Sequence, residues 1–148
     1  MTRITPIPAE QAGWFTRFTY WYAKKLYGRL PGALSVLAQN PGILRAVAGF
    51  EFWSARSRKV DKKLKILAEV RVATLVGCRY CLDIGSAIAR GHGVTERQLL
   101  ELDEYATSDA FGAEERAALE FASCVTSIPC DVPDELFARG IAFLLRVG

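Results

Sequence analysis

The sequence predicts an all-α fold, a single-domain orthogonal bundle of about seven helices. Apolar residues recur at helical spacing in most of the chain, and helix-start signals such as Asn40-Pro41 precede several of these segments. No segment shows the alternation of a strand bounded by hairpin turns. With 148 residues, 51% apolar and 24% charged, the chain is large enough for one real core and too apolar to be disordered. We found no repeat or linker, so we expect one domain over residues 1–148.

The first predicted helix, residues 8–27, is unusually rich in aromatic side chains. It holds seven of the sixteen aromatic residues of the chain, on nearly every face and interleaved with Lys and Arg. One core contact does not require so many. We therefore favour a helix that lies between its own core and a neighbouring subunit over an interfacial membrane helix.

The next helices follow from local signals. Pro31-Gly32 ends the aromatic helix, residues 33–39 form a short one, and Asn40 caps a third that begins at Pro41. Five apolar residues of this third helix form one stripe that is predicted to face inward: Ile43, Leu44, Val47, Phe50 and Trp53.

A basic stretch over residues 56–65 is predicted to be a solvated turn and helix start. The signals after it are an apolar helical run that ends at Gly77, a helix from Cys78 to the glycines of 91–93, a Thr95–Gln98 capping box, a helix over 113–127 and a last helix that starts at 131–134.

The net charge of +3 hides an asymmetry along the chain. Residues 1–74 hold 13 Lys/Arg and 4 Asp/Glu (+9), whereas residues 75–148 hold 6 and 12 (−6). No basic-aromatic recognition motif accompanies the positive half, so we expect the halves to complement one another rather than to bind nucleic acid. No stretch approaches the ~20 apolar residues of a membrane helix, and the N-terminus has no apolar signal core. Four cysteines do not make a disulfide scaffold, so a cytoplasmic protein without a membrane partner is expected.

The two cysteines of the sequence Cys78-Arg-Tyr-Cys81 are the strongest chemical signal. Thiols at i and i+3 on a new helix lie about 60° apart around its axis, close enough for a disulfide. The positive end of the helix dipole and the unpaired N–H groups there favour thiolate over thiol. The pair is therefore a candidate redox couple in which at least one thiol pKa is lowered.

Other constellations are weaker. His92, the only histidine, follows the cysteine helix in a glycine turn and is interpreted as a loop residue. Cys124 and Cys130 offer two more sulfurs for a zinc site with the first pair, but their spacing fits poorly and Cys124 lies on an apolar face. We expect no metal and no bound cofactor.

The segment from Leu64 to Asp83, with Glu69, Arg71, Gly77 and the cysteine pair, resembles the carboxymuconolactone decarboxylase / alkylhydroperoxidase D-like family. The resemblance covers roughly residues 40–140, which leaves residues 1–39 as an N-terminal aromatic extension. It implies an all-helical fold that assembles into a trimer or hexamer, or a dimer. It also implies thiol-dependent peroxidase chemistry, because the decarboxylase branch typically lacks the cysteine pair.

The resemblance implies that Cys81 is the peroxidatic thiolate and that Cys78 resolves its sulfenic acid as a disulfide. Helix-end electrostatics alone favours Cys78 as the thiol of lower pKa, so both assignments stay open. The family motif places a His four residues after the second cysteine and a Glu twelve before the first. Here these positions are Gly85 and Ile66.

Two residues are candidate substitutes for the missing proton relay. Glu69 lies one turn after Ile66 on the same helix and is interpreted either as a base or as a structural ion-pair partner. Tyr80, inside the cysteine pair, offers a phenol donor. The candidate catalytic residues are therefore Cys78, Cys81, Glu69 and Tyr80.

The sequence thus predicts an oligomeric thiol peroxidase or disulfide oxidoreductase that reduces hydroperoxides and is itself reduced by an external thiol or disulfide partner. The alternative is an oligomeric helical protein that binds a small ligand without turnover and uses the cysteine pair for structure or redox sensing. A lactone decarboxylase-like enzyme is less favoured, since its histidine base has no counterpart.

Overall fold

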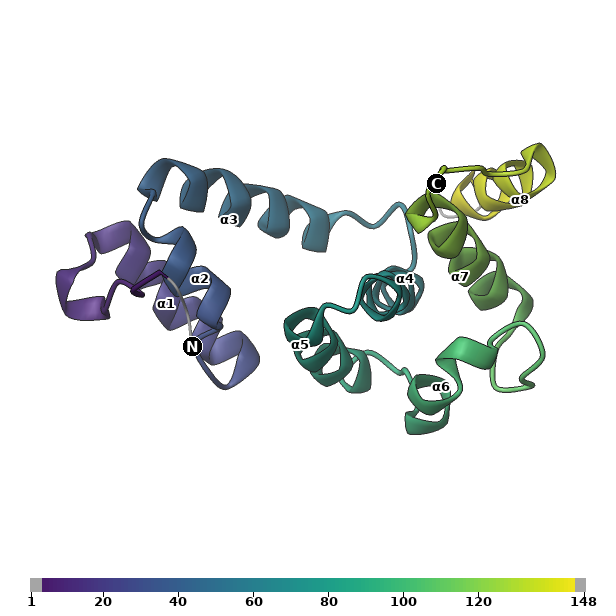
Figure 1. The fold of residues 1–148 in the computed structure, drawn as a ribbon, viewed down its shortest axis with the longest axis horizontal. Helices are drawn as coiled ribbons and strands as arrows, with labels where there is room; N and C mark the ends of the chain where they lie inside the picture. Colours follow the sequence, from purple (N-terminus) through teal and green to yellow (C-terminus); the bar gives the residue numbers. More distant parts are fainter. Residues whose placement is uncertain (1–3, 146–148) are drawn as a thin grey trace. The chain divides into compact units, whose positions relative to one another are not determined.

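The computed structural model describes residues 4–145, and these residues form helices and connecting turns without a strand (Figure 1). The predicted all-α class is therefore confirmed, with eight α-helices rather than about seven. Residues 1–3 and 146–148 of the predicted domain lie outside the described residues. Within residues 4–145, no helix combines the length and the apolar character that a bilayer crossing requires.

The bounds of these elements fix the labels used below. The helices are α1 (Trp14–Tyr27), α2 (Gly32–Leu37), α3 (Pro41–Arg56), α4 (Lys62–Leu75), α5 (Arg79–Arg90), α6 (Glu96–Leu100), α7 (Ala113–Thr126) and α8 (Asp134–Leu145), with the 3-10 turns η1 (Ala9–Gln11) and η2 (Leu102–Glu104).

The chain divides into two compact units with separate cores. The N-terminal unit is residues 1–57 and the C-terminal unit is residues 58–148, so the boundary falls just before α4, inside the predicted 40–140 core. Tyr20, Ala38 and Leu44 form the core of the N-terminal unit. The larger core of the C-terminal unit is centred on the fully buried Leu67 and Leu119.

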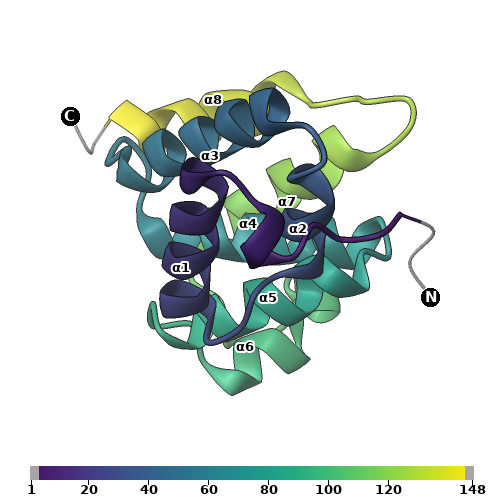
Figure 2. The same ribbon diagram turned by 90° about the vertical axis from the view of Figure 1, so that its left-hand side faces the viewer.

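In the N-terminal unit, the predicted helix over residues 8–27 is interrupted. The 3-10 turn η1 ends at Gln11, and α1 begins only at Trp14, after Gly13. The helix ends at Gly28, whose positive φ of 71° suits a residue without a Cβ. Helices α1 and α2 both contact α3 (Figure 2). Most aromatic side chains of α1 remain exposed, but Tyr20 is buried and donates a hydrogen bond to the Ile7 carbonyl.

Helix α3 begins as predicted but does not bury its predicted stripe. The Asn40 side chain accepts hydrogen bonds from the N–H groups of Gly42 and Ile43, as an N-cap does. Of the five stripe residues, only Leu44 is buried. The expectation that the whole stripe faces inward is therefore wrong: α1 and α2 cover only one edge of the helix, so the rest of its apolar face is left outside the core.

In the C-terminal unit, α4 lies between α5 and α7, and α8 packs on α7 (Figure 1). Helix α4 buries Ile66, Leu67, Val70 and Ala73, spaced at i, i+1, i+4 and i+7, so it presents one continuous face to the core. The central position of α4 matters for the site, because its C-terminal end leads directly into the cysteine pair.

A polar network ties α4 and α6 to the start of α7. Glu115 accepts hydrogen bonds from the Gly112 N–H and from the buried Gln98 amide, and it forms an ion pair with Lys63 at 2.6 Å. The predicted Thr95–Gln98 capping box is confirmed, with both of its reciprocal hydrogen bonds present. Burial alone would raise the pKa of Glu115, but Lys63, Gly112 and Gln98 together hold that pKa below its ordinary value.

This network predicts acid-sensitive stability. Because the Glu115 pKa is lower in the folded chain than in the unfolded one, its ionised form stabilises the fold above the ordinary value of 4.5. That contribution is lost as the pH falls through the folded pKa. We expect Glu115→Gln to lower the urea midpoint at about pH 7 and to differ much less from the parent at about pH 3.5. Glu114→Gln, on the exposed neighbouring residue, is the matched control, and equal pH profiles for the two variants would contradict the prediction.

Candidate functional site

Local sequence brings α4 and α5 together at the cysteine pair. Helix α4 ends in a Schellman arrangement: the Cys78 N–H donates to the Ala73 carbonyl, and the Gly77 N–H donates to the Thr74 carbonyl. Gly77 has a φ of 68°, in the left-handed region that favours glycine. The residue after this turn, Cys78, is at once the end of this motif and the N-cap of α5.

Cys78 and Cys81 are joined by a disulfide, with Cα atoms 5.3 Å apart. The Cys81 N–H donates to the Cys78 sulfur at 3.3 Å, the hydrogen bond that an N-cap side chain makes. The prediction that the pair opens a helix and lies within bonding distance is therefore confirmed in geometry. A sulfur at this position faces the positive end of the α5 dipole.

The two sulfurs differ in their access to solvent. Cys78 is half-buried, whereas Cys81 is exposed. Three large apolar residues close to them in the chain are exposed as well: Leu75 and Val76 at the end of α4 and Tyr80 in the first turn of α5. The exposed Cys81 sulfur leaves the disulfide open to a reactant.

The structure places the other two predicted site residues on the helices that meet at the disulfide. Tyr80 lies between the cysteines in sequence, and Glu69 is an exposed residue of α4. The structural interpretation of Glu69 is an ion pair with Arg71 or with a neighbouring helix. Arg71 forms an ion pair with Asp103, donates to Ser123 and stacks on the Tyr105 ring.

The positions of the missing proton relay are packed as apolar core. Ile66 is buried in the core of the C-terminal unit. Gly85 lies so close to α4 that a Cβ atom on it would be 3.0 Å from the Val70 side chain. Apolar contact between α4 and α5 therefore replaces the polar pair at these two positions.

The remaining candidates lie on other elements than the cysteine pair. His92 is half-buried in the turn after α5, Cys124 is half-buried on α7, and Cys130 is exposed after it. Among residues 4–145, no group of three His, Cys, Asp or Glu side chains has the arrangement of a metal site.

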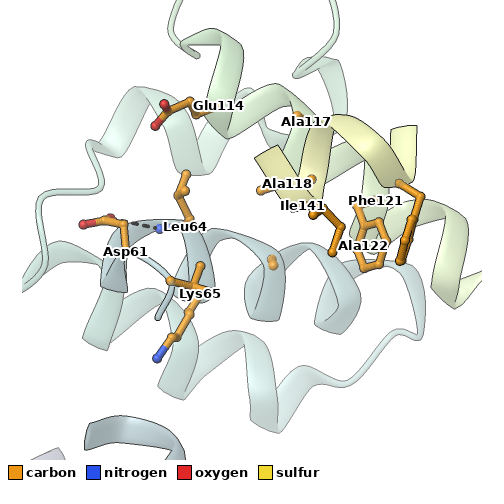
Figure 3. A pocket seen from close by; sticks show the side chains of 13 residues that line it. Asp61, Leu64, Lys65, Glu114, Ala117, Ala118, Phe121, Ala122 and Ile141 are labelled. Carbon is orange, nitrogen blue, oxygen red and sulfur yellow. Dashed lines mark hydrogen bonds between the residues drawn. The ribbon is translucent and has the colours of Figure 1, made fainter. Parts of the chain in front are cut away.

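A cavity that the sequence analysis missed lies elsewhere in the C-terminal unit. It has a volume of about 340 Å³ and is bounded by α4, α7 and α8 (Figure 3). Small residues line much of it: Ala68, Ala117, Ala118, Ala122 and Gly140. Their helical spacing on α7 was the available signal, but spacing alone does not tell a close helix contact from a hollow. On α4 the cavity extends only as far as Ala68, ten residues before Cys78.

Fold and site together define an all-helical protein with a solvent-accessible Cys-x-x-Cys disulfide at the start of a helix. The family model described as "Carboxymuconolactone decarboxylase family" matches residues 41–123, more than half of the chain. The chain belongs to the carboxymuconolactone decarboxylase family.

Two bacterial relatives match the chain in sequence. The uncharacterized protein YdfG of Bacillus subtilis is 34% identical over 85 residues, which are 57% of this chain and 58% of that protein. The uncharacterized protein YnjA of Escherichia coli is 29% identical over 120 residues, which are 80% of this chain and 66% of that protein. The matched segments thus span less than two thirds of either relative.

The structural relatives include an enzyme. The debrominase Bmp8 has been solved without ligand and, as a cysteine-to-alanine variant, in complex with 2,3,4-tribromopyrrole. Both structures match with a TM-score of 0.81, at 26% and 25% sequence identity, over 97% of this chain and 76% of the debrominase.

Proposed function

We propose that this protein is a dithiol oxidoreductase that reduces hydroperoxides at the Cys78–Cys81 pair. The observation that carries the proposal is the disulfide itself, formed at the N-terminus of α5 with an exposed sulfur at Cys81. A disulfide between neighbouring, accessible cysteines is the oxidised product of such a reaction.

Cys81 is the attacking thiolate in this proposal, and Cys78 is the resolving thiol. A peroxide must reach the attacking sulfur, and Cys81 is the more exposed of the two. The Cys81 N–H donates to Cys78 Sγ and can stabilise the negative charge that develops there as the Cys78 thiol loses its proton and attacks the sulfenic acid. Solvent access thus favours the assignment that the family resemblance implies.

The proposed cycle balances in three steps. The Cys81 thiolate attacks the O–O bond, becomes a sulfenic acid, and releases an alkoxide that takes up a proton as the alcohol. The Cys78 thiol then displaces water from the sulfenic acid and forms the disulfide. An external dithiol donates two electrons and two protons, which regenerates both thiols and leaves the partner as its own disulfide.

Tyr80 and Glu69 are the proposed proton-transfer groups. The Tyr80 phenol adjoins Cys81 in the chain and can donate to the departing alkoxide. Glu69 lies one turn after Ile66, the position at which the family motif has a glutamate. It can accept a thiol proton through water. Ile66 is buried in the core and Gly85 lies against α4, so Tyr80 and Glu69 take the place of the absent polar pair in this proposal.

Reductive debromination is the second candidate, favoured by the similarity to the debrominase Bmp8. The same pair of thiols suits that reaction. The Cys81 thiolate takes bromine from an electron-rich ring, the ring carbon takes up a proton, and Cys78 displaces bromide to give the same disulfide. The net change is one C–Br bond reduced to C–H for two thiols oxidised, so only the electrophile differs.

Thiol counting with two electrophiles tests both candidates. The reduced chain has four thiols, and one equivalent of cumene hydroperoxide should lower that number to two, much faster than it oxidises free dithiothreitol. A Cys78→Ser/Cys81→Ser variant keeps Cys124 and Cys130 and should lose none of its two thiols on that timescale. In a parallel arm, 2,3,4-tribromopyrrole replaces the hydroperoxide and bromide is measured.

The outcomes separate the functions. Fast thiol loss with hydroperoxide and no bromide release supports the peroxidase, whereas one bromide per disulfide supports the debrominase. If the pair reacts with both reagents no faster than free dithiothreitol does, both proposals fail. The non-catalytic ligand-binding protein with a structural or redox-sensing pair would then be favoured.

A further inference from the structure

The cavity bounded by α4, α7 and α8 lies within the C-terminal unit and has no part in the proposed thiol chemistry. All of its lining residues belong to that unit, from Val60 to Ile141. On α4 the lining ends at Ala68, about 10 Å along the helix before its last residue, Leu75. Cys78 follows only after the turn at the end of α4. A function of the cavity would therefore be separate from that of the cysteine pair.

The interior of the cavity is apolar. Leu64 of α4, Phe121 of α7 and Ile141 of α8 contribute large apolar side chains (Figure 3), and Ala118 and Gly140 leave space between them. Among residues 4–145, no buried side-chain nitrogen or oxygen lacks a hydrogen-bond partner. The cavity thus offers apolar contact, without a buried polar side chain that would require a polar ligand.

The charged residues of the lining are Asp61, Lys65 and Glu114. They lie at one side of the cavity, with Phe121 at the other (Figure 3). The Asp61 carboxylate already accepts two backbone N–H groups as the N-cap of α4, and Glu114 is exposed to water. A charged ligand inside would lose its hydration without gaining a buried partner, which is costly. These features favour an uncharged ligand.

Volume and lining indicate the size and the kind of this ligand. An apolar cavity of roughly 150 Å³ is large enough for one benzene ring. This cavity has about 340 Å³, enough for two fused rings. Phe121 and Phe137 offer ring contacts to an aromatic ligand. Phe137 and Ile141 of α8 are 53% and 37% exposed, so a ligand can enter beside α8 and would cover apolar surface there.

We propose that this cavity binds an uncharged aromatic molecule of about two fused rings. The rings contact Leu64, Phe121 and Ile141 and therefore touch α4, α7 and α8 at once. Because the ligand requires the packed arrangement of these three helices, its binding stabilises the folded chain. This site is additional to the proposed activity at the cysteine pair and does not depend on it.

Three probes that share one ring system test the chemistry of the site. They are 2-naphthylmethanol, which is uncharged, 2-naphthylmethylamine, which is a cation, and 2-naphthoate, which is an anion. Equilibrium dialysis should give a dissociation constant of about 100 µM or lower for 2-naphthylmethanol, and values at least about tenfold higher for both charged probes. Equal affinity for the three probes, or tighter binding of a charged one, would overturn the proposal.

Variants of the chain test the place of binding. Ala118→Trp puts a large side chain into the cavity and should weaken the binding of 2-naphthylmethanol by at least about tenfold. Ala118→Leu, which disturbs the packing less, should weaken it by a smaller factor. Ala87→Trp, on an exposed position of α5, is the matched control and should bind like the parent. Circular dichroism checks that each variant is folded.

The remaining outcomes separate this site from its alternatives. The Cys78→Ser/Cys81→Ser chain should bind 2-naphthylmethanol like the parent. A loss of binding in that chain would place the probe at the cysteine pair and overturn the proposal. A parent chain that binds none of the three probes would also overturn it, and the cavity would then be filled by protein side chains. Unchanged binding in both Ala118 variants would show that the probe lies elsewhere.

Discussion

The Cys81→Ser chain should lose hydroperoxide turnover by roughly 10³-fold or more, on the scale of removing a covalent nucleophile. A serine hydroxyl is not ionised near neutral pH, so it cannot attack the O–O bond as a thiolate does. Cys78→Ser should also stop turnover, but for a different reason. Its exposed Cys81 still reacts once, and the sulfenic acid then has no resolving partner.

Pre-steady-state kinetics separates the two variants. One equivalent of hydroperoxide should disappear rapidly with Cys78→Ser, and dimedone should label its Cys81. Neither should occur with Cys81→Ser. Cys130→Ser, which replaces the other exposed cysteine, is the matched control and should retain parent turnover. If Cys81→Ser carries out the single fast reaction and Cys78→Ser does not, the helix-end argument is right and the roles of the two cysteines are exchanged.

The parts of the site that the sequence predicted are those that contiguous residues encode. The helix end at Gly77, the helix start at the cysteine pair and the capping box at Thr95 each need only three to six residues in the right order. Because these signals depend on neighbouring residues and not on distant contacts, they can be recognised in the sequence. They placed the disulfide at the start of α5 without knowledge of the packing around it.

What the sequence could not predict depends on contacts between distant segments. Periodicity showed that α3 has an apolar stripe, but it could not show that only Leu44 meets the core. The break of the first helix at Gly13 was missed because the apolar pattern continues through it. The cavity arises where α7 and α8 pack together beside α4, although α8 begins almost sixty residues after α4 ends.

The histidine that is absent at position 85 also depends on contacts between distant segments. We expect Gly85→His to destabilise the chain by about 1–3 kcal/mol, the cost of overpacking a close contact, and to leave peroxidase activity no higher than in the parent. The reason is the 3.0 Å separation between a Cβ at this position and the Val70 side chain, which is itself buried. A Cβ there would require the Val70 side chain to give way before an imidazole could be accommodated near Cys81.

Urea unfolding of the parent and four variants tests this steric explanation. Ala87→His places the same side chain on an exposed position of α5 and should change stability by less than about 0.5 kcal/mol. Val70→Ala removes the opposing methyl groups, so the Gly85→His/Val70→Ala chain should be more stable than the two separate losses predict, by at least about 0.5 kcal/mol. Additive losses would show that Val70 is not the obstacle. A gain in peroxidase activity in Gly85→His would show that α5 can accommodate the histidine of the family motif. The packing of α4 against α5 would then not explain why the histidine is absent here, and its absence would limit the rate.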